Sequence, residues 1–483
     1  MQILTIQRIL GLLLSLFSIT MLPPLAVSLY YQDGADQAFF TAFVLLLIIG
    51  TLLWLPVRRH RKELKIRDGF IVVVMFWIAL GLSGALPFFL TTYPVMSFTD
   101  AVFESMSGLT TTGATVLTGL DSLPKAVLFY RQFLQWLGGM GIVVLAVAIL
   151  PLLGVGGMQL YRAETPGPMK DSKLTPRITE TAKALWVIYL SLTVACAVAF
   201  YWAGMSWFDA ICHSFSTVAI GGFSTHDASI GYFNSATIEM VTVLFMLIAG
   251  MNFSLHFLAW RHRSIRHYLA DSELRVYLAI LLLISVVTSL YLYFTHTFDE
   301  PWTAVHQGVF QAVSIGTTTG FTTTDYSLWP GFLPILLLMS SYIGGCAGST
   351  GGGMKVIRVL LLFKQGYREV LRLIHPNAIF AIKINNKALP DKVVGAVWGF
   401  FALYVFCFSI MHLFLMATGL DVVTSFSAVT ACLNNLGPGL GEVGVNFGDI
   451  NSPSKWMLCV AMLLGRLEIF TLLVVLTPAF WRR

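Results

Sequence analysis

The chain has 483 residues, of which 57% are hydrophobic and only 11% are charged. Soluble domains carry about 25% charged residues, so this composition excludes an ordinary soluble protein and indicates a polytopic membrane protein. The net charge of +6 comes from basic residues gathered in a few loops. Such loops orient a membrane protein and touch anionic lipid, and they predict no nucleic-acid partner.

The first two apolar stretches, 9–31 and 39–57, are each long enough to cross a bilayer. No cleavable signal peptide is evident, so the first stretch is expected to be retained as a helix. After a basic loop at 58–68, a pattern repeats four times. It consists of an apolar span, a short mixed segment that ends in glycine, a polar loop and a second apolar span.

The spans of the four units bring the predicted total to about ten transmembrane helices in an all-α protein. First spans are expected at 69–90, 182–202, 274–294 and 393–416, and second spans at 129–153, 238–259, 332–362 and 456–476. The expected divisions are a two-helix preface at 1–68 and repeats at 69–168, 169–265, 266–375 and 376–483. Since 26 of the 30 Lys and Arg lie on one side, that side and both termini are predicted to be cytoplasmic.

The short middle segments align without gaps as DAVFESMSGLTTTGAT (100–115), DAICHSFSTVAIGGFS (209–224), QGVFQAVSIGTTTGFT (307–322) and TSFSAVTACLNNLGPG (424–439). One glycine column contains Gly113, Gly222, Gly320 and Gly437, and a second contains Gly139, Gly250, Gly345 and Gly465. Segments of this length are too short to span, and non-helical backbone at membrane depth is tolerated where it lines a water-filled path. The repeats therefore predict four re-entrant loops that meet in a pseudo-fourfold arrangement around one pore.

Backbone carbonyls can replace the hydration shell of a potassium ion, and glycine lets the backbone turn its carbonyls inward. Small threonines keep such a path open, and their hydroxyls offer further oxygens. A single TTTG could equally be a turn or a helix-packing glycine, but four aligned copies favour a selectivity filter. The predicted potassium-binding residues are Thr110, Thr111, Thr112, Gly113, Ala219, Ile220, Gly221, Gly222, Thr317, Thr318, Thr319, Gly320, Asn434, Asn435, Leu436 and Gly437.

These four units, together with GGCAGSTGGGMKVIR (344–358), NNLGPGLG (434–441) and GRLEIFTLLVV (465–475), resemble the Trk/Ktr/HKT superfamily of cation transporters over essentially the whole chain. The resemblance implies potassium uptake across a bacterial cytoplasmic membrane, an intramembrane loop that acts as a gate, and a homodimer. It also implies a TrkA-like cytosolic RCK-type ring that binds nucleotide. The four predicted filter segments, TTTG, AIGG, TTTG and NNLG, differ in their side chains. We therefore expect potassium and rubidium to pass well, with some sodium or caesium leakage.

The second span of the third unit is interrupted by GGCAGSTGGG, in which six of ten residues are glycine. Such a run cannot hold a stable helix, whereas the other second spans are expected to continue as helix. Arg466 falls in an apolar span, where a charge is costly. We expect it either to point into the pore below the filter or to contact loop carbonyls. A pairing with Glu468 is a further alternative. The predicted gate residues are Gly344, Gly345, Cys346, Ala347, Gly348, Ser349, Thr350, Gly351, Gly352, Gly353 and Arg466.

The basic linker 354–392 directly follows this loop. We therefore expect a cytosolic regulator to bind the linker and to act on the loop through it. The chain has no P-loop or Rossmann fingerprint, so nucleotide control is expected only through the partner, with potassium as substrate and no cofactor. The six single cysteines favour neither a metal site nor disulfides. Paired catalytic carboxylates and nucleophile motifs are absent from the sequence, so an enzyme is not expected. The alternative function is a potassium symporter coupled to protons or sodium, for which Glu104 and Glu468 are the candidate carboxylates.

Overall fold

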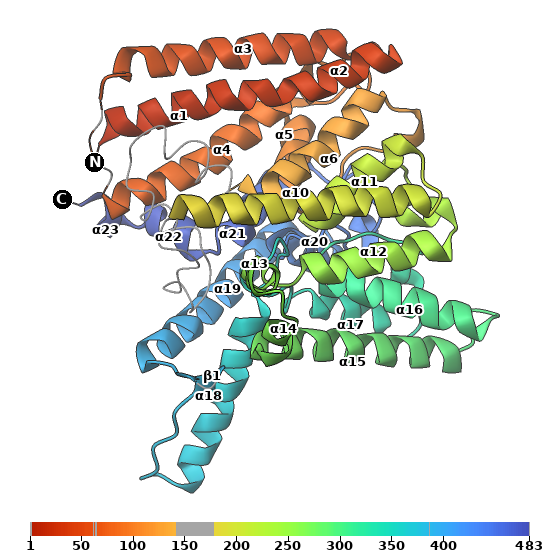
Figure 1. Ribbon diagram of the computed structural model, residues 1–483, viewed down its shortest axis with the longest axis vertical. Helices are drawn as coiled ribbons and strands as arrows, with labels where there is room; N and C mark the ends of the chain where they lie inside the picture. The colour runs from red at the N-terminus through yellow and green to blue at the C-terminus, as the bar shows by residue number, and fades with distance from the viewer. Residues whose placement is uncertain (1, 61, 63–64, 142–177, 386, 483) are drawn as a thin grey trace.

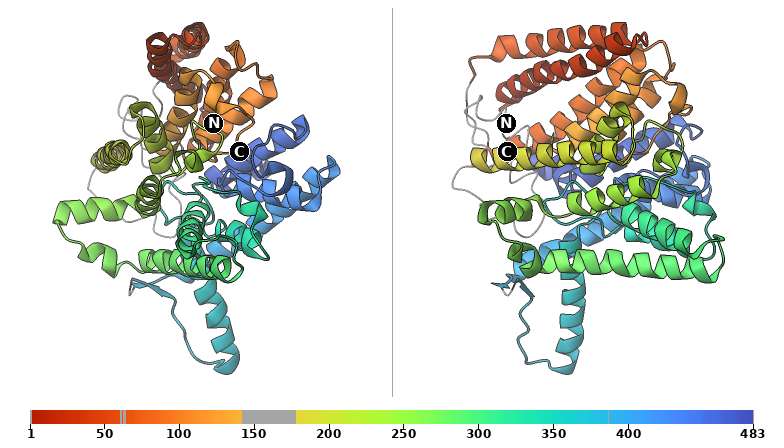
Figure 2. Two further views of the ribbon diagram at one scale, coloured as in Figure 1. Left: turned by 90° about the vertical axis from the view of Figure 1, so that its right-hand side faces the viewer. Right: turned by 45° about the vertical axis from the view of Figure 1, so that its right-hand side comes forward.

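The computed structural model describes residues 2–60, 62, 65–141, 178–385 and 387–482. Within these residues every element of regular secondary structure is helical apart from one short antiparallel hairpin, formed by β1 (Lys383–Ile384) and β2 (Lys387–Ala388). The ribbon colours pass from orange through yellow, green and cyan to blue as successive parts of the chain follow one another around the molecule (Figures 1 and 2). This circular order is what four repeated units around an axis require.

The first two spans lie side by side at one edge of the molecule (Figure 1). The first runs through α1 (Ile3–Ser18), a 3-10 turn at Ile19–Met21 and α2 (Leu22–Tyr31), and so begins six residues before the predicted 9–31. The second consists of α3 (Asp36–Trp54) and a 3-10 turn at Leu55–Val57. A Cβ on Gly11 would lie 2.6 Å from the backbone nitrogen of Trp54, so glycine permits this close approach.

The four predicted first spans are confirmed as long helices whose bounds differ by a few residues from those expected. They are α4 (Ile66–Leu90), α10 (Ile178–Trp202), α15 (Ser272–Phe294) and α19 (Asp391–Ala417). Uninterrupted apolar sequence carries each helix across the membrane, and Asp271 caps α15 by accepting the backbone N–H of Leu274 at 2.8 Å.

The four short middle segments begin with helices of 12 to 16 residues. They are α5 (Phe98–Leu109), α11 (Trp207–Ala219), α16 (Pro301–Gly316) and α20 (Val422–Leu433). Side chains of Ser97, Ser206 and Asp421 cap three of them, and Pro301 occupies the first position of the fourth. These helices are too short to cross a bilayer, as expected.

Within the residues that the structure describes, the second spans of the second, third and fourth units are interrupted. The second spans comprise α6 (Lys125–Gly139), α12 (Ala236–Ala249) with α13 (Phe253–His262), α17 (Leu333–Ser340) with α18 (Val356–Ile374), and α21 (Ser452–Arg466) with α22 (Phe470–Leu476). The bend is 89° between α12 and α13 and 116° between α21 and α22. The expectation that these two continue as helix was therefore wrong.

The predicted number of ten spans can be compared with the part of the chain that is described. Six helices there are long and apolar enough to cross a membrane, or eight if each bent pair forms one span. Of the other two expected spans, 129–153 extends beyond residue 141 and so leaves the described residues, as does much of the basic loop that follows it. The span expected at 332–362 is divided by the 344–353 loop.

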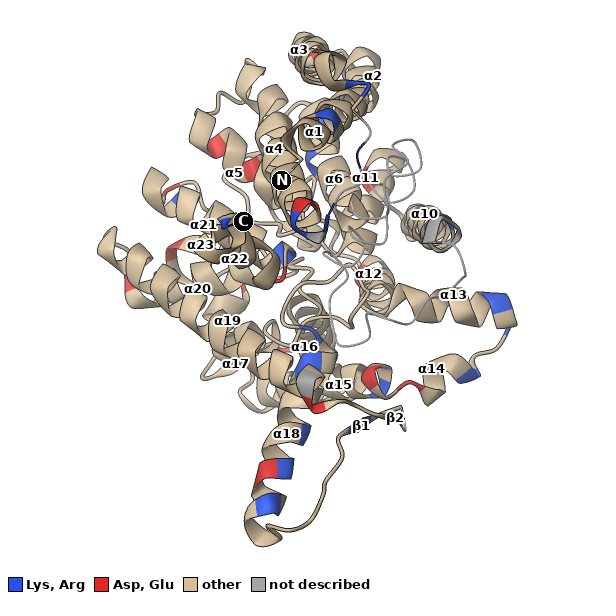
Figure 3. Cartoon of the chain, turned by 90° about the vertical axis from the view of Figure 1, so that its left-hand side faces the viewer, with Lys and Arg blue, Asp and Glu red and all other residues tan. Residues whose placement is uncertain are grey.

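Short elements complete the described structure. They are 3-10 turns at Leu120–Ser122, Ser229–Phe233, Tyr326–Leu328 and Gly441–Val443, and helices α14 (Arg266–Ala270) and α23 (Pro478–Trp481). Lys and Arg gather on α13, α14 and α18 on one side of the molecule, while most of the helical body carries no charge (Figure 3). Helix α18 extends away from that body (Figure 1).

Candidate functional site

The four short helices end in the same way despite their different sequences. In each, the residue before the column glycine donates its backbone N–H to the carbonyl five residues earlier. The four bonds, Thr112 to Ser107, Gly221 to Ser216, Thr319 to Ser314 and Leu436 to Ala431, are all 2.8 Å long. This bond turns the chain back under the helix end and leads it into an extended strip. We call residues 110–113, 219–222, 317–320 and 434–437 the four strips.

The strips also share their backbone angles. The second residue of each strip is left-handed, with φ of 54° at Thr111, 54° at Ile220, 68° at Thr318 and 53° at Asn435. This conformation is rare for threonine and isoleucine, which are β-branched. Three different kinds of side chain, Thr, Ile and Asn, adopt it at this one position, so the backbone path is the feature that the four strips share.

The column glycines close the strips into a ring. Their φ values are 81°, 77°, 81° and 101° at Gly113, Gly222, Gly320 and Gly437. A Cβ on each would meet a carbonyl oxygen of the next strip in the cyclic order one, two, three, four, one; these oxygens belong to Gly221, Thr319, Leu436 and Thr112. Glycine is therefore required both by the left-handed φ and by the space, and all sixteen predicted strip residues are brought together.

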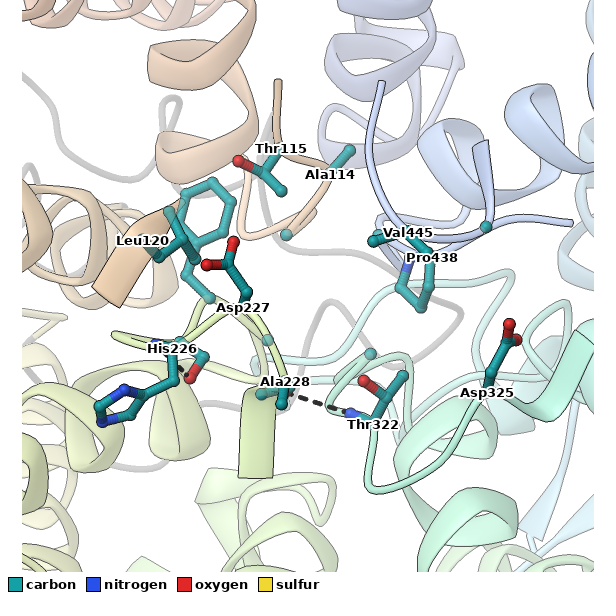
Figure 4. Close-up of a pocket in the computed structure, with 18 of the residues that line it drawn as sticks. Ala114, Thr115, Leu120, His226, Asp227, Ala228, Thr322, Asp325, Pro438 and Val445 are labelled. Atoms are coloured by element: carbon teal, nitrogen blue, oxygen red, sulfur yellow. Dashed lines mark hydrogen bonds between the residues drawn. The ribbon is translucent and has the colours of Figure 1, made fainter. Parts of the chain in front are cut away.

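A cavity of about 270 Å³ opens above the ring and is lined by all four column glycines. The residues that follow the glycines, among them Ala114, Thr115 and Pro438, surround this hollow together with the outer loops (Figure 4). The outer loops also bond across units: the N–H of Thr322 donates to the Ser229 hydroxyl at 3.3 Å. The cavity is the outer approach to the ring.

Threonine hydroxyls were expected to offer oxygens to an ion, but most of them serve another purpose. The hydroxyls of Thr110 and Thr112 lie 2.7 Å apart, and Thr110 donates to the carbonyl of Met106 at 2.7 Å. Thr317 and Thr319 form the equivalent pair, also at 2.7 Å. These side chains hold the strip against its own helix, which leaves the backbone carbonyls as the oxygens common to all four strips.

The two asparagines of the fourth strip bond both to other units and to helices of their own unit. The Asn435 amide donates to the Thr112 hydroxyl at 2.9 Å and to the Met462 carbonyl at 3.1 Å. The Asn434 amide donates to the Ser341 hydroxyl at 2.9 Å, and its oxygen accepts from Tyr404. Both asparagines therefore fix the position of the strip.

Several residues that support the ring were missed in the sequence. Arg131 is buried and donates to Glu104 at 2.6 Å, to the Ser224 carbonyl at 3.0 Å and to the Thr115 hydroxyl at 3.0 Å. Gln135 donates to the Gly221 carbonyl at 2.6 Å. The available signal was an Arg and a Gln four residues apart in an apolar helix, which place polar groups on one face. Glu104, a candidate for proton coupling, is thus fully engaged in an ion pair.

The 344–353 loop lies directly beneath the ring, as predicted for a gate. The N–H of Gly352 donates to the Thr318 hydroxyl at 2.7 Å, and that of Gly353 donates to the Asn434 carbonyl at 3.0 Å. Left-handed φ values of 68°, 76° and 70° occur at Gly344, Gly348 and Gly353. The loop therefore contacts the third and fourth strips through its own backbone N–H groups, and its left-handed turns depend on glycine.

Further contacts tie this loop to the second unit. The Thr350 hydroxyl donates to the Val218 carbonyl at 2.9 Å, and the Cys346 N–H donates to the Gly250 carbonyl at 2.9 Å. Lys355, at the end of the loop, is buried and donates to the Gly351 carbonyl. Lys355 has no distinguishing signal in the sequence, where it reads as the start of the basic linker.

Arg466 is the last residue of α21 and reaches the 344–353 loop. Its guanidinium donates to the carbonyls of Thr350, at 3.4 Å, and Gly138, and lies over the Trp77 ring. The expected contact with loop carbonyls is therefore present. A pairing with Glu468 was a wrong alternative, because Glu468 forms its ion pair with Arg358.

Comparisons with known proteins agree with this geometry. A family model described as TrkH, cation transport protein, matches residues 35–482. The Trk system potassium uptake protein TrkH of Vibrio parahaemolyticus is 62% identical over the whole of both chains, and that of Escherichia coli K12 is 58% identical over 99% of both. The crystal structure of the potassium transporter TrkH from Vibrio parahaemolyticus is similar to this structure over the full length of both chains, with 60% sequence identity and a TM-score of 0.91.

Proposed function

Because the chain belongs to the TrkH family of cation transport proteins, we propose that it is a multi-pass membrane protein for potassium uptake. The observation that carries this proposal is the closed ring of four strips with one backbone path. Carbonyl rings of this kind replace the hydration shell of a potassium ion. The short helices point their C-terminal ends toward the ring, and the partial negative charge there favours a cation.

The 344–353 loop and Arg466 form the gate in this proposal. The loop lies across the underside of the ring, and the guanidinium of Arg466 holds it through the Thr350 carbonyl. A cation leaving the strips meets the loop backbone and a positive charge. Transport therefore requires the loop to move.

The ion pairs of the two candidate coupling carboxylates favour an uncoupled, channel-like pathway over a symporter. Glu104 is paired with Arg131, and Glu468 with Arg358. A coupling role would require these carboxylates to leave their arginine partners. A reversal potential that follows the potassium gradient at every pH is expected for a channel-like path; a shift with pH would support coupling.

The regulatory assembly is proposed from the linker and from the exposed face of α18. Its apolar residues Phe363, Tyr367, Val370 and Ile374 are all more than half exposed and recur at helical spacing. Such a face supports a protein contact, which we assign to a homodimer, with a TrkA-like nucleotide-binding ring on the basic cytosolic side. We also propose that the protein lies in the bacterial inner membrane with both termini in the cytoplasm. Its five divisions end at residues 68, 168, 265, 375 and 483 in this proposal.

Potassium or rubidium flux into liposomes that contain the purified full chain tests both parts of the site. Gly320→Ser should lower flux by roughly tenfold or more, because a side chain there is strained and overlaps the Leu436 carbonyl. Gly366→Ser on α18, where a Cβ meets open space, is the matched control. Arg466→Ala should raise basal flux. The filter assignment fails if Gly320→Ser transports like Gly366→Ser, and the gate assignment fails if Arg466→Ala leaves basal flux unchanged.

A further inference from the structure

The first turn of α15 holds the 344–353 loop from a distant part of the chain. One carboxylate oxygen of Glu273 accepts the backbone N–H of Ala347 at 2.7 Å and that of Ile357 at 3.1 Å. Ala347 lies within the loop, and Ile357 lies in the first turn of α18. A single buried oxygen of Glu273 thus joins the 344–353 loop to the start of α18.

This contact also satisfies a helix end that has no local cap. Helix α18 begins after Lys355, whose side chain makes no capping bond. The carboxylate of Glu273 supplies the missing acceptor and places a negative charge at the positive end of the helix dipole. Bonds from backbone N–H groups to a carboxylate are among the stronger hydrogen bonds in proteins.

The two residues just before Glu273 are bonded to the cytosolic hairpin. The Asn385 side-chain oxygen accepts from the N–H and the hydroxyl of Ser272, at 2.8 and 2.7 Å. The Asn385 amide donates to the Asp271 carboxylate at 3.0 Å. Asn385 follows β1 and has a left-handed φ of 46°, which presents its side chain toward α15.

From these contacts we propose that residues 271–273 form a joint that couples the position of the cytosolic hairpin to the 344–353 loop. Glu273 is the positioning residue of this joint. The route from Asn385 to Ala347 crosses only three consecutive residues at one helix start, whereas the covalent route runs through the whole of α18. Displacement of the hairpin therefore acts on the loop directly. The inference rests on the proposed gate.

Cys346 offers a native reporter of the loop position. Its side chain is buried and directly precedes Ala347, and the other five cysteines are buried as well. A small water-soluble maleimide applied to the full-length protein in detergent modifies Cys346 only when the loop moves. Mass spectrometry distinguishes this modification from that of Cys459 in α21, which reports general loosening. The reporter does not require transport.

Glu273→Ala should raise the rate of Cys346 modification by about tenfold, as expected for loss of the hydrogen bond that holds Ala347, and should raise basal rubidium flux. Glu273→Gln keeps an acceptor oxygen and should give a smaller increase. Asn385→Gly keeps the left-handed backbone and removes the amide, and should also increase Cys346 modification. Glu369→Ala, an exposed carboxylate on α18, is the matched control.

Three results would overturn the joint. The Cys346 rate in Glu273→Ala could equal that of Glu369→Ala, Cys459 could react in parallel with Cys346, or Asn385→Gly could leave Cys346 unchanged. Failure of the proposed function is distinguishable, because it appears as absent flux in the wild type and in Arg466→Ala while Cys346 still responds to Glu273→Ala.

Discussion

His226 stands at the outer mouth of the ring, where it contacts two carboxylates. It hydrogen-bonds Asp121, lies 3.5 Å from Asp209 and stacks on Tyr232 with ring centroids 3.4 Å apart. Burial alone would lower the pKa of His226, but the two neighbouring carboxylates of Asp209 and Asp121 outweigh it and raise the pKa above 6.5. Burial likewise opposes a lowered pKa for Asp121, and the His226 bond overcomes it.

These shifts predict how stability depends on pH. The His226 contribution is complete below its unfolded pKa and is lost as pH rises through the raised folded pKa. The Asp121 contribution is lost as pH falls through its lowered pKa. Thermal unfolding should show that His226→Gln lowers the melting temperature more at about pH 6 than at about pH 9. A penalty that is equal at both values, or larger at pH 9, would contradict the ion pair.

At this scale the sequence predicted the residues that repeat but not their partners. The column glycines stand out because four copies align, and the structure confirms their left-handed angles. Arg131, Gln135 and Lys355 have no counterparts at equivalent positions to draw attention to them. Their roles arise from contacts made in the folded protein, which the alignment of the four repeats does not reveal.

At the scale of elements, the outer spans were predictable and the breaks in the inner spans were not. Continuous apolar sequence favours a helix, and RLEIF (466–470) contains neither glycine nor proline. Yet Glu468 and Ile469 have φ of 53° and 56°. The ion pair of Glu468 with Arg358 and the bond of Arg466 to Thr350 lie on either side of this break. Tertiary contacts here override local helix propensity.

Substitution by alanine at two helical glycines is expected to change the stability of the protein in opposite directions. A Cβ on Gly138 would overlap the Leu109 carbonyl, so Gly138→Ala forces α6 away from α5 and should cost about 2 kcal/mol or more. A Cβ on Gly366 meets nothing within 4 Å, so Gly366→Ala should stabilise α18 by up to about 1 kcal/mol. Denaturation of the purified protein measures both. Equal effects of the two substitutions would refute the close approach of α6 to α5.

At the scale of the whole molecule, Asn435 links the last unit to the first. Asn435→Gly keeps the left-handed backbone but removes the bonds to Thr112 and Met462. We expect the potassium-to-sodium permeability ratio to fall by about fivefold, as for loss of the one hydrogen bond, to Thr112, that joins the two units. Asn234→Gly, at another left-handed position in an outer loop, is the control. Equal ratios in the two variants would show that this brace does not shape the ring.

The circular order of the units follows from the repeats, because four copies in one orientation can bury their short segments only around a common axis. The loop beneath the ring was predictable from its glycine content. Its attachment to Glu273 was not, since that contact joins residues 74 positions apart that share no motif.

The ring is built from one polypeptide, and this has a genetic consequence. In a pore assembled from four identical subunits, any substitution is imposed at four places at once. Here a change in one strip alters a single quarter. The fourth strip therefore carries asparagines that bond to its neighbours, while the other three strips have threonine or alanine and isoleucine at the same places. Each quarter of the ring is free to take on a separate task, provided that its glycine remains.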